Sequence, residues 1–133
     1  MKSSILVVDD HELNLKLARE ILTARGYEVV VAACGEEAVK VARDRRFALV
    51  LLDMQLPDMD GLEVLGRLRN LPETKHLTIV ALTAQAMAGD RERFLAAGCD
   101  GYIQKPISLR TFSQQVEQYL ARSSAGATSD ERV

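Results

Sequence analysis

Short apolar segments alternate with longer amphipathic ones along the whole chain. The short segments are Ile5–Val8, Glu28–Ala32, Ala48–Leu52, Thr78–Leu82 and Gly101–Gln104. Most of them are rich in Val, Ile and Leu without polar alternation, as is typical of strands covered on both faces of a parallel sheet. The pattern therefore predicts five largely buried strands joined by longer connections.

The first connection has the periodicity of a helix. Its buried stripe is predicted to consist of Leu13, Leu17, Ala18, Ile21 and Leu22, and Gly26 is placed to end the helix. Leu15 falls off this stripe, so we expect its side chain to lie on the helix surface.

Four further helices are expected between and after the remaining strands. They are predicted from Glu36 to about Arg45, from near Asp60-Gly61 to just before Pro72, from Asp90 to Gly98, and after Ser108 through Leu109, Phe112, Val116 and Leu120. Asp90 and Ser108 are residue types that favour N-caps, whereas proline and glycine favour helix ends.

Strict alternation of strands and helices predicts an α/β fold with a parallel sheet, right-handed crossovers and helices on both faces. At this length the expected fold is the flavodoxin-like doubly wound (βα)5 layout, with strand order 2-1-3-4-5. We expect one domain over residues 1–122. Residues 123–133 are small, polar and aperiodic, and are predicted to form a disordered tail.

Composition narrows the classes of partner. The chain has 17 basic and 19 acidic residues and a net charge of −2, so no basic surplus favours nucleic-acid binding. No apolar run approaches the length of a membrane span or of a signal-peptide core, which predicts a cytoplasmic protein. Cys34 and Cys99 match no metal or redox spacing and are expected to be reduced, semi-buried thiols.

Polar residues follow the predicted strands at the points where the strands end. Asp9-Asp10 follow the first strand, Asp53 the third, Thr83 the fourth and Lys105-Pro106 the fifth. In folds of this class, ligands bind outside the carboxyl ends of the strands, where the strand order reverses. Three carboxylates, a hydroxyl and an ammonium are therefore expected to converge on one crevice.

The expected crevice suits a hard divalent cation. Closely packed carboxylates repel one another unless a cation joins them, and oxygen ligands with room for water favour Mg²⁺ over zinc. A carboxylate is also a competent phosphoryl acceptor, and Asp53 is central among these groups. Each residue alone has a plainer interpretation, since Asp9 or Asp10 could cap a helix and Lys105 could be solvated. Their joint placement at successive strand ends favours a site.

Four motifs in order resemble those of response-regulator receiver domains of two-component signalling. They are Val7-Val8-Asp9-Asp10, Leu51–Pro57 with Asp60-Gly61, Ala81-Leu82-Thr83-Ala84, and Lys105-Pro106. The resemblance covers roughly residues 4–122.

The resemblance implies a role for each matched residue. Asp53 would take a phosphoryl group from a phosphohistidine on a partner protein. Asp10 would bind Mg²⁺ directly, together with Asp53 and the backbone carbonyl of Gln55, and Asp9 would act mostly through water. Thr83 would hydrogen-bond the phosphoryl oxygen and Lys105 would pair with it. Such a domain is a signalling module and not an enzyme, although it assists its own phosphorylation and slow dephosphorylation.

The resemblance also implies a switch. Tyr102 occupies the place of the family's aromatic switch residue, and Pro106 would follow a cis peptide bond. Phosphorylation would draw Thr83 inward and let Tyr102 turn, which changes the face made by the fourth helix, the fifth strand and the fifth helix. The surroundings of these motifs look most like stand-alone DivK-type receivers or the receivers of hybrid histidine kinases.

The resemblance implies a single-domain regulator that is phosphorylated by a histidine kinase or a histidine phosphotransfer protein. The expected protein is a monomer or weak dimer that controls a downstream protein partner. An excised hybrid-kinase receiver acting as a phosphorelay intermediate is the alternative. Leu15 is placed where family members dock their phosphodonor, although a single exposed leucine is more often incidental.

Three other readings of the same pattern are less well supported. A phosphatase of the haloacid-dehalogenase type wants a second aspartate two residues after the first, and here that position is Gln55. A flavin carrier on the same sheet needs a hydroxyl-rich phosphate loop after the first strand, where Asp9-Asp10 would repel phosphate. A pseudo-receiver would lack part of the acid, threonine and lysine set, which is complete here.

Overall fold

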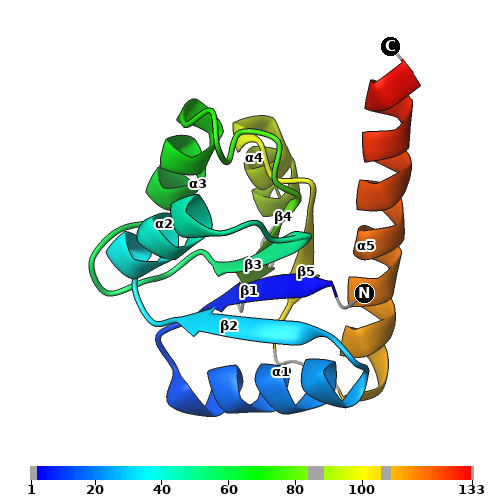
Figure 1. Cartoon of the computed structure of the whole chain (residues 1–133). Coiled ribbons are helices and arrows are strands. Elements are labelled where there is room, and N and C mark those ends of the chain that lie inside the picture. The colour runs from blue at the N-terminus through cyan, green and yellow to red at the C-terminus, as the bar shows by residue number, and fades with distance from the viewer. Residues whose placement is uncertain (1–2, 84–88, 106–108, 133) are drawn as a thin grey trace.

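Helices and strands alternate along the described chain (Figure 1). The computed structural model describes residues 3–83, 89–105 and 109–132, with only the backbone described at 109 and 122–132. The strands are β1 (Ser4–Val8), β2 (Glu28–Ala32), β3 (Leu49–Asp53), β4 (Ile79–Thr83) and β5 (Gly101–Gln104). The helices are α1 (Glu12–Ala24), α2 (Gly35–Asp44), α3 (Gly61–Asn70), α4 (Asp90–Ala97) and α5 (Leu109–Arg132).

The strands form one parallel sheet in the order β2-β1-β3-β4-β5, which confirms the predicted flavodoxin-like topology. Helices α1 and α5 cover one face of the sheet, and α2, α3 and α4 cover the other (Figure 1). Successive strand residues alternate between the two faces. Ile5 and Val7 thus pack with α1 and α5, while Leu6 and Val8 pack with the opposite helices.

The prediction for the buried stripe of α1 was wrong at Leu13. Ala18, Ile21 and Leu22 are buried, but the Leu13 side chain is 78% exposed. At 100° per residue, Leu13 lies about 140° around the helix from Ala18, away from the sheet. Leu15 lies about 60° from Ala18 on the same measure. It is half-buried and packs against the core, so it is not the surface leucine that the sequence predicted.

The ends of the last two helices differ in detail from the expected ones. Gly89, with φ of 92°, is the N-cap of α4 and Asp90 is its first residue, whereas the sequence predicted Asp90 as the cap. Helix α5 continues to Arg132, through the segment that was predicted to be a tail. The expected cap Ser108 lies outside the described residues. The division into a domain at 1–122 and a tail at 123–133 stays a prediction.

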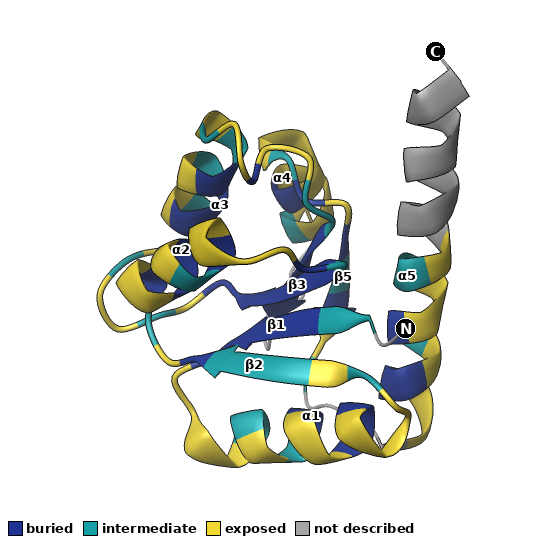
Figure 2. Ribbon diagram, viewed as in Figure 1, coloured by how far each residue is buried: buried dark blue, intermediate teal, exposed yellow. Residues whose placement is uncertain are grey.

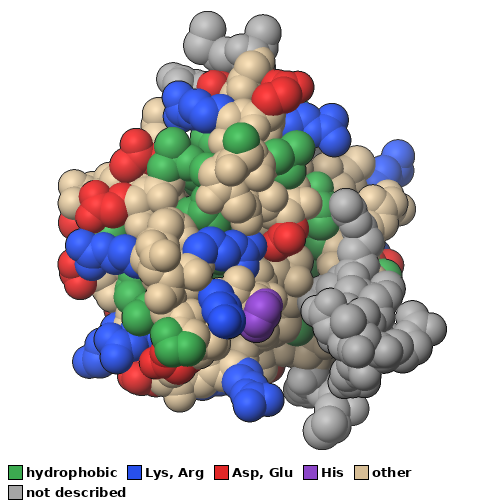
Figure 3. All heavy atoms as spheres, turned by 90° about the horizontal axis from the view of Figure 1, so that it is seen from above, with side chains coloured by type: hydrophobic (Ala, Val, Ile, Leu, Met, Phe, Trp, Pro, Cys, Tyr) green, Lys and Arg blue, Asp and Glu red, His purple; other side chains and the backbone are tan. Residues whose placement is uncertain are grey.

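The surface and the cysteines fit the composition. Acidic and basic side chains are interspersed on the face shown in Figure 3, in keeping with a net charge of −2. Both cysteines are free thiols, and Cys99 is buried, which raises its pKa to about 11. Within the described residues, none of the helices combines the length and the apolar character that a membrane crossing requires.

Candidate functional site

The carboxyl ends of β1, β3 and β4 place three polar residues side by side. Asp53 and Thr83 are the last residues of β3 and β4, and Asp9 follows β1 directly. These strands are neighbours in a parallel sheet, so their ends meet at one edge. All three residues are buried. Strand β3, whose end carries Asp53, is dark blue and therefore buried in Figure 2. The sheet therefore presents polar groups at the end of an otherwise apolar core.

The Lys105 ammonium lies between two buried carboxylates. Its Nζ is 2.8 Å from Asp9 Oδ2 and 3.1 Å from Asp53 Oδ2. The three side chains are 10%, 1% and 5% exposed, respectively. The backbone N–H of Lys105 donates to the Thr83 carbonyl at 2.7 Å, which aligns the end of β5 with the end of β4. A buried charge is tolerated when it is paired, and here one cation serves two anions.

Asp9 also accepts hydrogen bonds from the turn that follows it. The His11 backbone N–H donates to Asp9 Oδ1 at 2.9 Å, and the His11 Nδ1 lies 3.1 Å from the same oxygen. Burial raises the pKa of Asp9, but the nearby Lys105 ammonium and the hydrogen bonds from His11 outweigh burial and bring the pKa below its ordinary value. Asp9 is therefore ionised at neutral pH.

The pKa of Asp53 is shifted in the opposite direction to that of Asp9. Burial raises its pKa above the ordinary value, and the bonds from Gln55 and Lys105 only partly offset this effect. Burial lowers the pKa of Lys105, but its ion pairs with the two carboxylates outweigh burial and raise the pKa above its ordinary value. With Asp10 beside them, Asp9 and Asp53 place three carboxylates near the Lys105 ammonium, an arrangement that favours a further cation.

The acidic side chains are spaced to share such a cation. Ligand atoms of Asp9, Asp10, His11 and Asp53 all lie within 4.8 Å of one another. Among the described residues, the buried Oδ2 of Asp9 has Lys105 as its ion-pair partner but accepts no hydrogen bond. Asp10 is the more open of the acidic pair, with 33% of its side chain exposed. Several carboxylate oxygens with an open side fit a hard ion such as Mg²⁺.

The loop between β3 and α3 is tied closely to Asp53. The Gln55 backbone N–H donates to Asp53 Oδ1 at 2.9 Å. At the far end of the loop, Asp60 caps α3 by accepting from the Leu62 N–H at 2.9 Å. Gly61 then passes so close that an added Cβ would lie 2.5 Å from the Met54 Cα. Only glycine fits the chain at this point.

The comparisons with known proteins agree with this geometry. Residues 5–117 match the family described as the response regulator receiver domain. The chain belongs to this family. It is 44% identical to the polar-differentiation response regulator DivK of Brucella anthropi over 90% of this chain and 98% of that protein. The resemblance to DivK-type receivers is thereby confirmed.

Solved receivers share the fold. A CheY-like receiver domain protein from Methanospirillum hungatei superposes with a TM-score of 0.86 at 31% identity, covering 95% of this chain and 99% of that one. The receiver domain of a Pseudomonas aeruginosa sensor histidine kinase gives a TM-score of 0.82 at 31% identity, covering 91% and 99%. That structure has a magnesium ion coordinated in its active site cleft.

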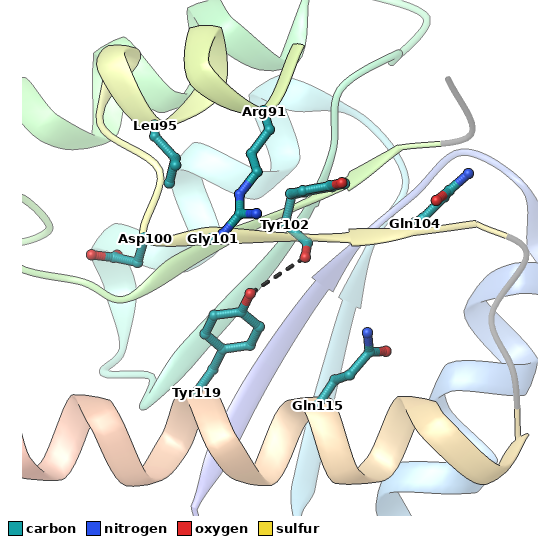
Figure 4. A pocket seen from close by; sticks show the side chains of 8 residues that line it. All are labelled: Arg91, Leu95, Asp100, Gly101, Tyr102, Gln104, Gln115 and Tyr119. Carbon is teal, nitrogen blue, oxygen red and sulfur yellow. Dashed lines mark hydrogen bonds between the residues drawn. The ribbon is translucent and has the colours of Figure 1, made fainter. Parts of the chain in front are cut away.

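Tyr102, the predicted switch residue, borders a groove between α4, β5 and α5. The groove has a volume of about 350 Å³ and is lined by Arg91, Leu95, Asp100, Gly101, Tyr102, Gln104, Gln115 and Tyr119 (Figure 4). The Arg91 guanidinium lies 5.9 Å from the centroid of the Tyr102 ring. Tyr119 donates its O–H to the Tyr102 carbonyl at 3.3 Å. Tyr102 is half-buried beside this groove, and its role as a switch residue stays a prediction.

The structure brings together Asp9, Asp10, Asp53 and Lys105 of the predicted set, with Thr83 at the next strand end. Pro106 and its predicted cis peptide bond lie outside the described residues, as does most of the loop after β4. The His11 side chain is 66% exposed, and its Nδ1 lies 3.1 Å from Asp9 Oδ1 and 3.2 Å from Asp10 Oδ1. Asp58, which the sequence did not single out, accepts hydrogen bonds from the Gly35 and Glu36 N–H groups at the start of α2.

Proposed function

We propose that Asp53 accepts a phosphoryl group from a phosphohistidine on a histidine kinase or a histidine phosphotransfer protein. The observation that carries this proposal is the Asp53 carboxylate, held at a strand end 3.1 Å from the Lys105 ammonium and beside two further aspartates. An Asp53 oxygen would form a bond to phosphorus as the phosphorus–nitrogen bond of the donor breaks. The imidazole then leaves, and Asp53 becomes an acyl phosphate.

Mg²⁺ is the proposed cofactor. Asp10, Asp53 and the Gln55 backbone carbonyl would hold it directly, and Asp9 would act through water. The openness of Asp10 and the engagement of Asp9 with Lys105 support this division. When bound, Mg²⁺ would neutralise charge on the carboxylates and on the phosphoryl oxygens.

The remaining polar groups would read the phosphoryl group. The Thr83 hydroxyl would donate to a phosphoryl oxygen, and Lys105 would move part of its pairing from the carboxylates to the new anion. Tyr102 would follow Thr83 inward and alter the α4-β5-α5 face, which contacts a downstream protein. The domain would act as a signalling switch that assists its own phosphorylation and slow dephosphorylation.

A stand-alone regulator is the favoured setting for this switch. The 44% identity to DivK over nearly the whole of both proteins exceeds the 31% identity to the receiver domain of the Pseudomonas aeruginosa sensor histidine kinase. A phosphorelay intermediate within a hybrid kinase is the alternative. In the favoured setting the protein is cytoplasmic, a monomer or weak dimer, and binds no nucleic acid.

Phosphorylation should depend on a divalent ion. With acetyl phosphate and Mg²⁺, we expect a hydroxylamine-sensitive phosphorylated species on a phosphate-affinity gel, because an acyl phosphate is cleaved by that nucleophile. With EDTA in place of Mg²⁺ the species should fall by at least about tenfold, since the site then lacks the charge that the metal supplies. Equal labelling with and without EDTA would contradict the proposed requirement for Mg²⁺.

Leu13 is the leucine that we now expect to contact the phosphodonor. It is 78% exposed in the first turn of α1, directly after the acidic turn, whereas Leu15 is half-buried. Leu13→Ala should slow phosphotransfer from a cognate histidine-phosphorylated protein by about tenfold, because an exposed apolar contact is lost on truncation. Labelling by acetyl phosphate and the melting temperature should not change.

Leu95→Ala provides the matched control, since Leu95 is the other large exposed hydrophobic residue described, at 40% exposure on α4. It should leave phosphotransfer unaltered. Equal slowing in both variants would show that Leu13 has no specific part in docking.

A further inference from the structure

The first turn of α2 has no cap of its own. The N-cap residue Cys34 forms no side-chain hydrogen bond to the helix, and a thiol is a weak acceptor. The first backbone N–H groups of a helix have no partner within the helix and need one from elsewhere. Cys34 nevertheless has the extended backbone of an N-cap, with φ of −151° and ψ of 168°.

Asp58 supplies the missing cap from another part of the chain. Its Oδ1 accepts from the Gly35 N–H at 2.8 Å, and its Oδ2 accepts from the Glu36 N–H at 3.0 Å. Both carboxylate oxygens are therefore used, and the negative charge lies at the positive end of the helix dipole. These two bonds lower the pKa of Asp58 below its ordinary value.

Asp58 lies in the loop that also carries Gln55. The base of this loop is closed by an isolated antiparallel bridge between Gln55 and Asp60 and by the Gly61 N–H, which donates to the Met54 carbonyl at 3.1 Å. The two bonds of Asp58 tie the outer part of the loop to α2. The loop is thus fixed between the sheet edge at one end and a helix start at the other.

Packing supports the same connection. Met59, the residue after Asp58, lies against Gly35, where an added Cβ would be 2.4 Å from the Met59 Cγ. Independently, the Glu36 side chain pairs with Arg67 of α3 at 3.1 Å. The start of α2 therefore stays linked to α3 without Asp58, and a variant at Asp58 is expected to fold.

We propose that Asp58 is a positioning residue for the Mg²⁺ site. It fixes the loop so that the Gln55 carbonyl faces the acidic cluster, and it couples the start of α2 to the metal. This inference rests on the proposed function, in which Gln55 is a metal ligand. Residues that orient metal ligands typically matter by about tenfold or more in metal affinity.

The coupling has to act in both directions. If fixing the loop through α2 strengthens Mg²⁺ binding, then Mg²⁺ binding has to strengthen the two hydrogen bonds at the start of α2. Amide hydrogen exchange at Gly35 and Glu36 should therefore slow when Mg²⁺ is added to the wild type. A purely structural cap would show no such response.

Four proteins test the proposal: the wild type, Asp58→Ala, the double variant Asp58→Ala with Cys34→Ser, and Asp44→Ala. The serine is a good N-cap residue and restores a local cap to α2, but it does not tie the loop. Asp44→Ala removes the same charge from the other end of the same helix. Mg²⁺ alone is titrated by calorimetry, and thermal unfolding in EDTA reports on stability.

We expect Asp58→Ala to weaken Mg²⁺ binding about tenfold and to lower the melting temperature in EDTA. The double variant should regain the melting temperature without regaining Mg²⁺ affinity, and Asp44→Ala should match the wild type in affinity. Mg²⁺ should slow amide exchange at Gly35 and Glu36 only where Asp58 is present.

Wild-type Mg²⁺ affinity in Asp58→Ala would overturn the positioning role, as would recovery of affinity in the double variant or an equal loss in Asp44→Ala. Absence of Mg²⁺ binding in the wild type would instead overturn the metal assignment in the proposed function. The two failures are therefore distinguishable.

Discussion

Gly61→Ala is expected to destabilise the protein by about 3 kcal/mol, because overpacking at a site that cannot yield costs this much. The added Cβ would lie 2.5 Å from the Met54 Cα and 2.8 Å from the Asp53 carbonyl oxygen. Both are backbone atoms at the end of β3, so the strand end has to move. Since that strand end carries Asp53, labelling by acetyl phosphate should also fall. Urea unfolding measures the first effect, and a phosphate-affinity gel the second.

Gly66→Ala is the matched control in the same helix. Apart from its chain neighbours and the backbone of its own helix, no atom of the described residues lies within 4 Å of a Cβ added at Gly66, in the interior of α3. Alanine is favoured over glycine inside a helix by about 1 kcal/mol, so this variant should be more stable than the wild type. Destabilisation of similar size in both variants would mean that helix propensity, and not the close approach at Gly61, decides the outcome.

Lys105→Met is expected to cost about 3 kcal/mol in EDTA, or roughly 10 °C in melting temperature. The methionine keeps most of the side-chain volume but leaves the buried carboxylates of Asp9 and Asp53 without their shared cation. Mg²⁺ should therefore stabilise this variant more than it stabilises the wild type, because a divalent ion restores the missing positive charge.

The loss of stability caused by Lys105→Met should become smaller as the pH falls. Burial raises the pKa of Asp53 in the folded wild type, so this carboxyl destabilises the fold increasingly as the pH rises through its titration range. Asp9 has a lowered pKa, to which Lys105 contributes, and it stabilises the wild type above that range. Removing Lys105 therefore weakens the stabilisation by ionised Asp9 and increases the destabilisation by ionised Asp53, and both changes matter less at low pH.

Melting temperatures are measured in EDTA at about pH 7.5 and about pH 5. The difference between Lys105→Met and the wild type should be smaller at the lower pH. A deficit that grows on acidification would contradict the arrangement of charges described above.

The fold and the centre of the site could be predicted from the sequence because they depend on simple patterns. Uninterrupted apolar strands imply a parallel sheet, and parallel strands bring their carboxyl ends to one edge. That argument alone predicts that Asp9, Asp53 and Lys105 lie together. In the structure, the Lys105 ammonium is 2.8 Å from Asp9 Oδ2 and 3.1 Å from Asp53 Oδ2. The direct pairing of Lys105 with Asp9 was not predicted, because it depends on side-chain reach.

Other features depend on contacts that leave no local signal. Asp58 looks like an ordinary turn residue, and its role as the cap of α2 appears only when segments distant in sequence are brought together. The exposure of Leu13 and the partial burial of Leu15 depend on how α1 is rotated against the sheet. A short stripe with five apolar positions does not fix that rotation.

The most direct test of the central claim is the intact mass of the protein after incubation with acetyl phosphate and Mg²⁺. The account predicts a gain of about 80 Da, the mass of one transferred phosphoryl group, in the wild type. It predicts no gain in Asp53→Asn, in which the acceptor carboxylate is replaced by an amide of similar shape. Absence of the gain in the wild type, or an equal gain in Asp53→Asn, would contradict it.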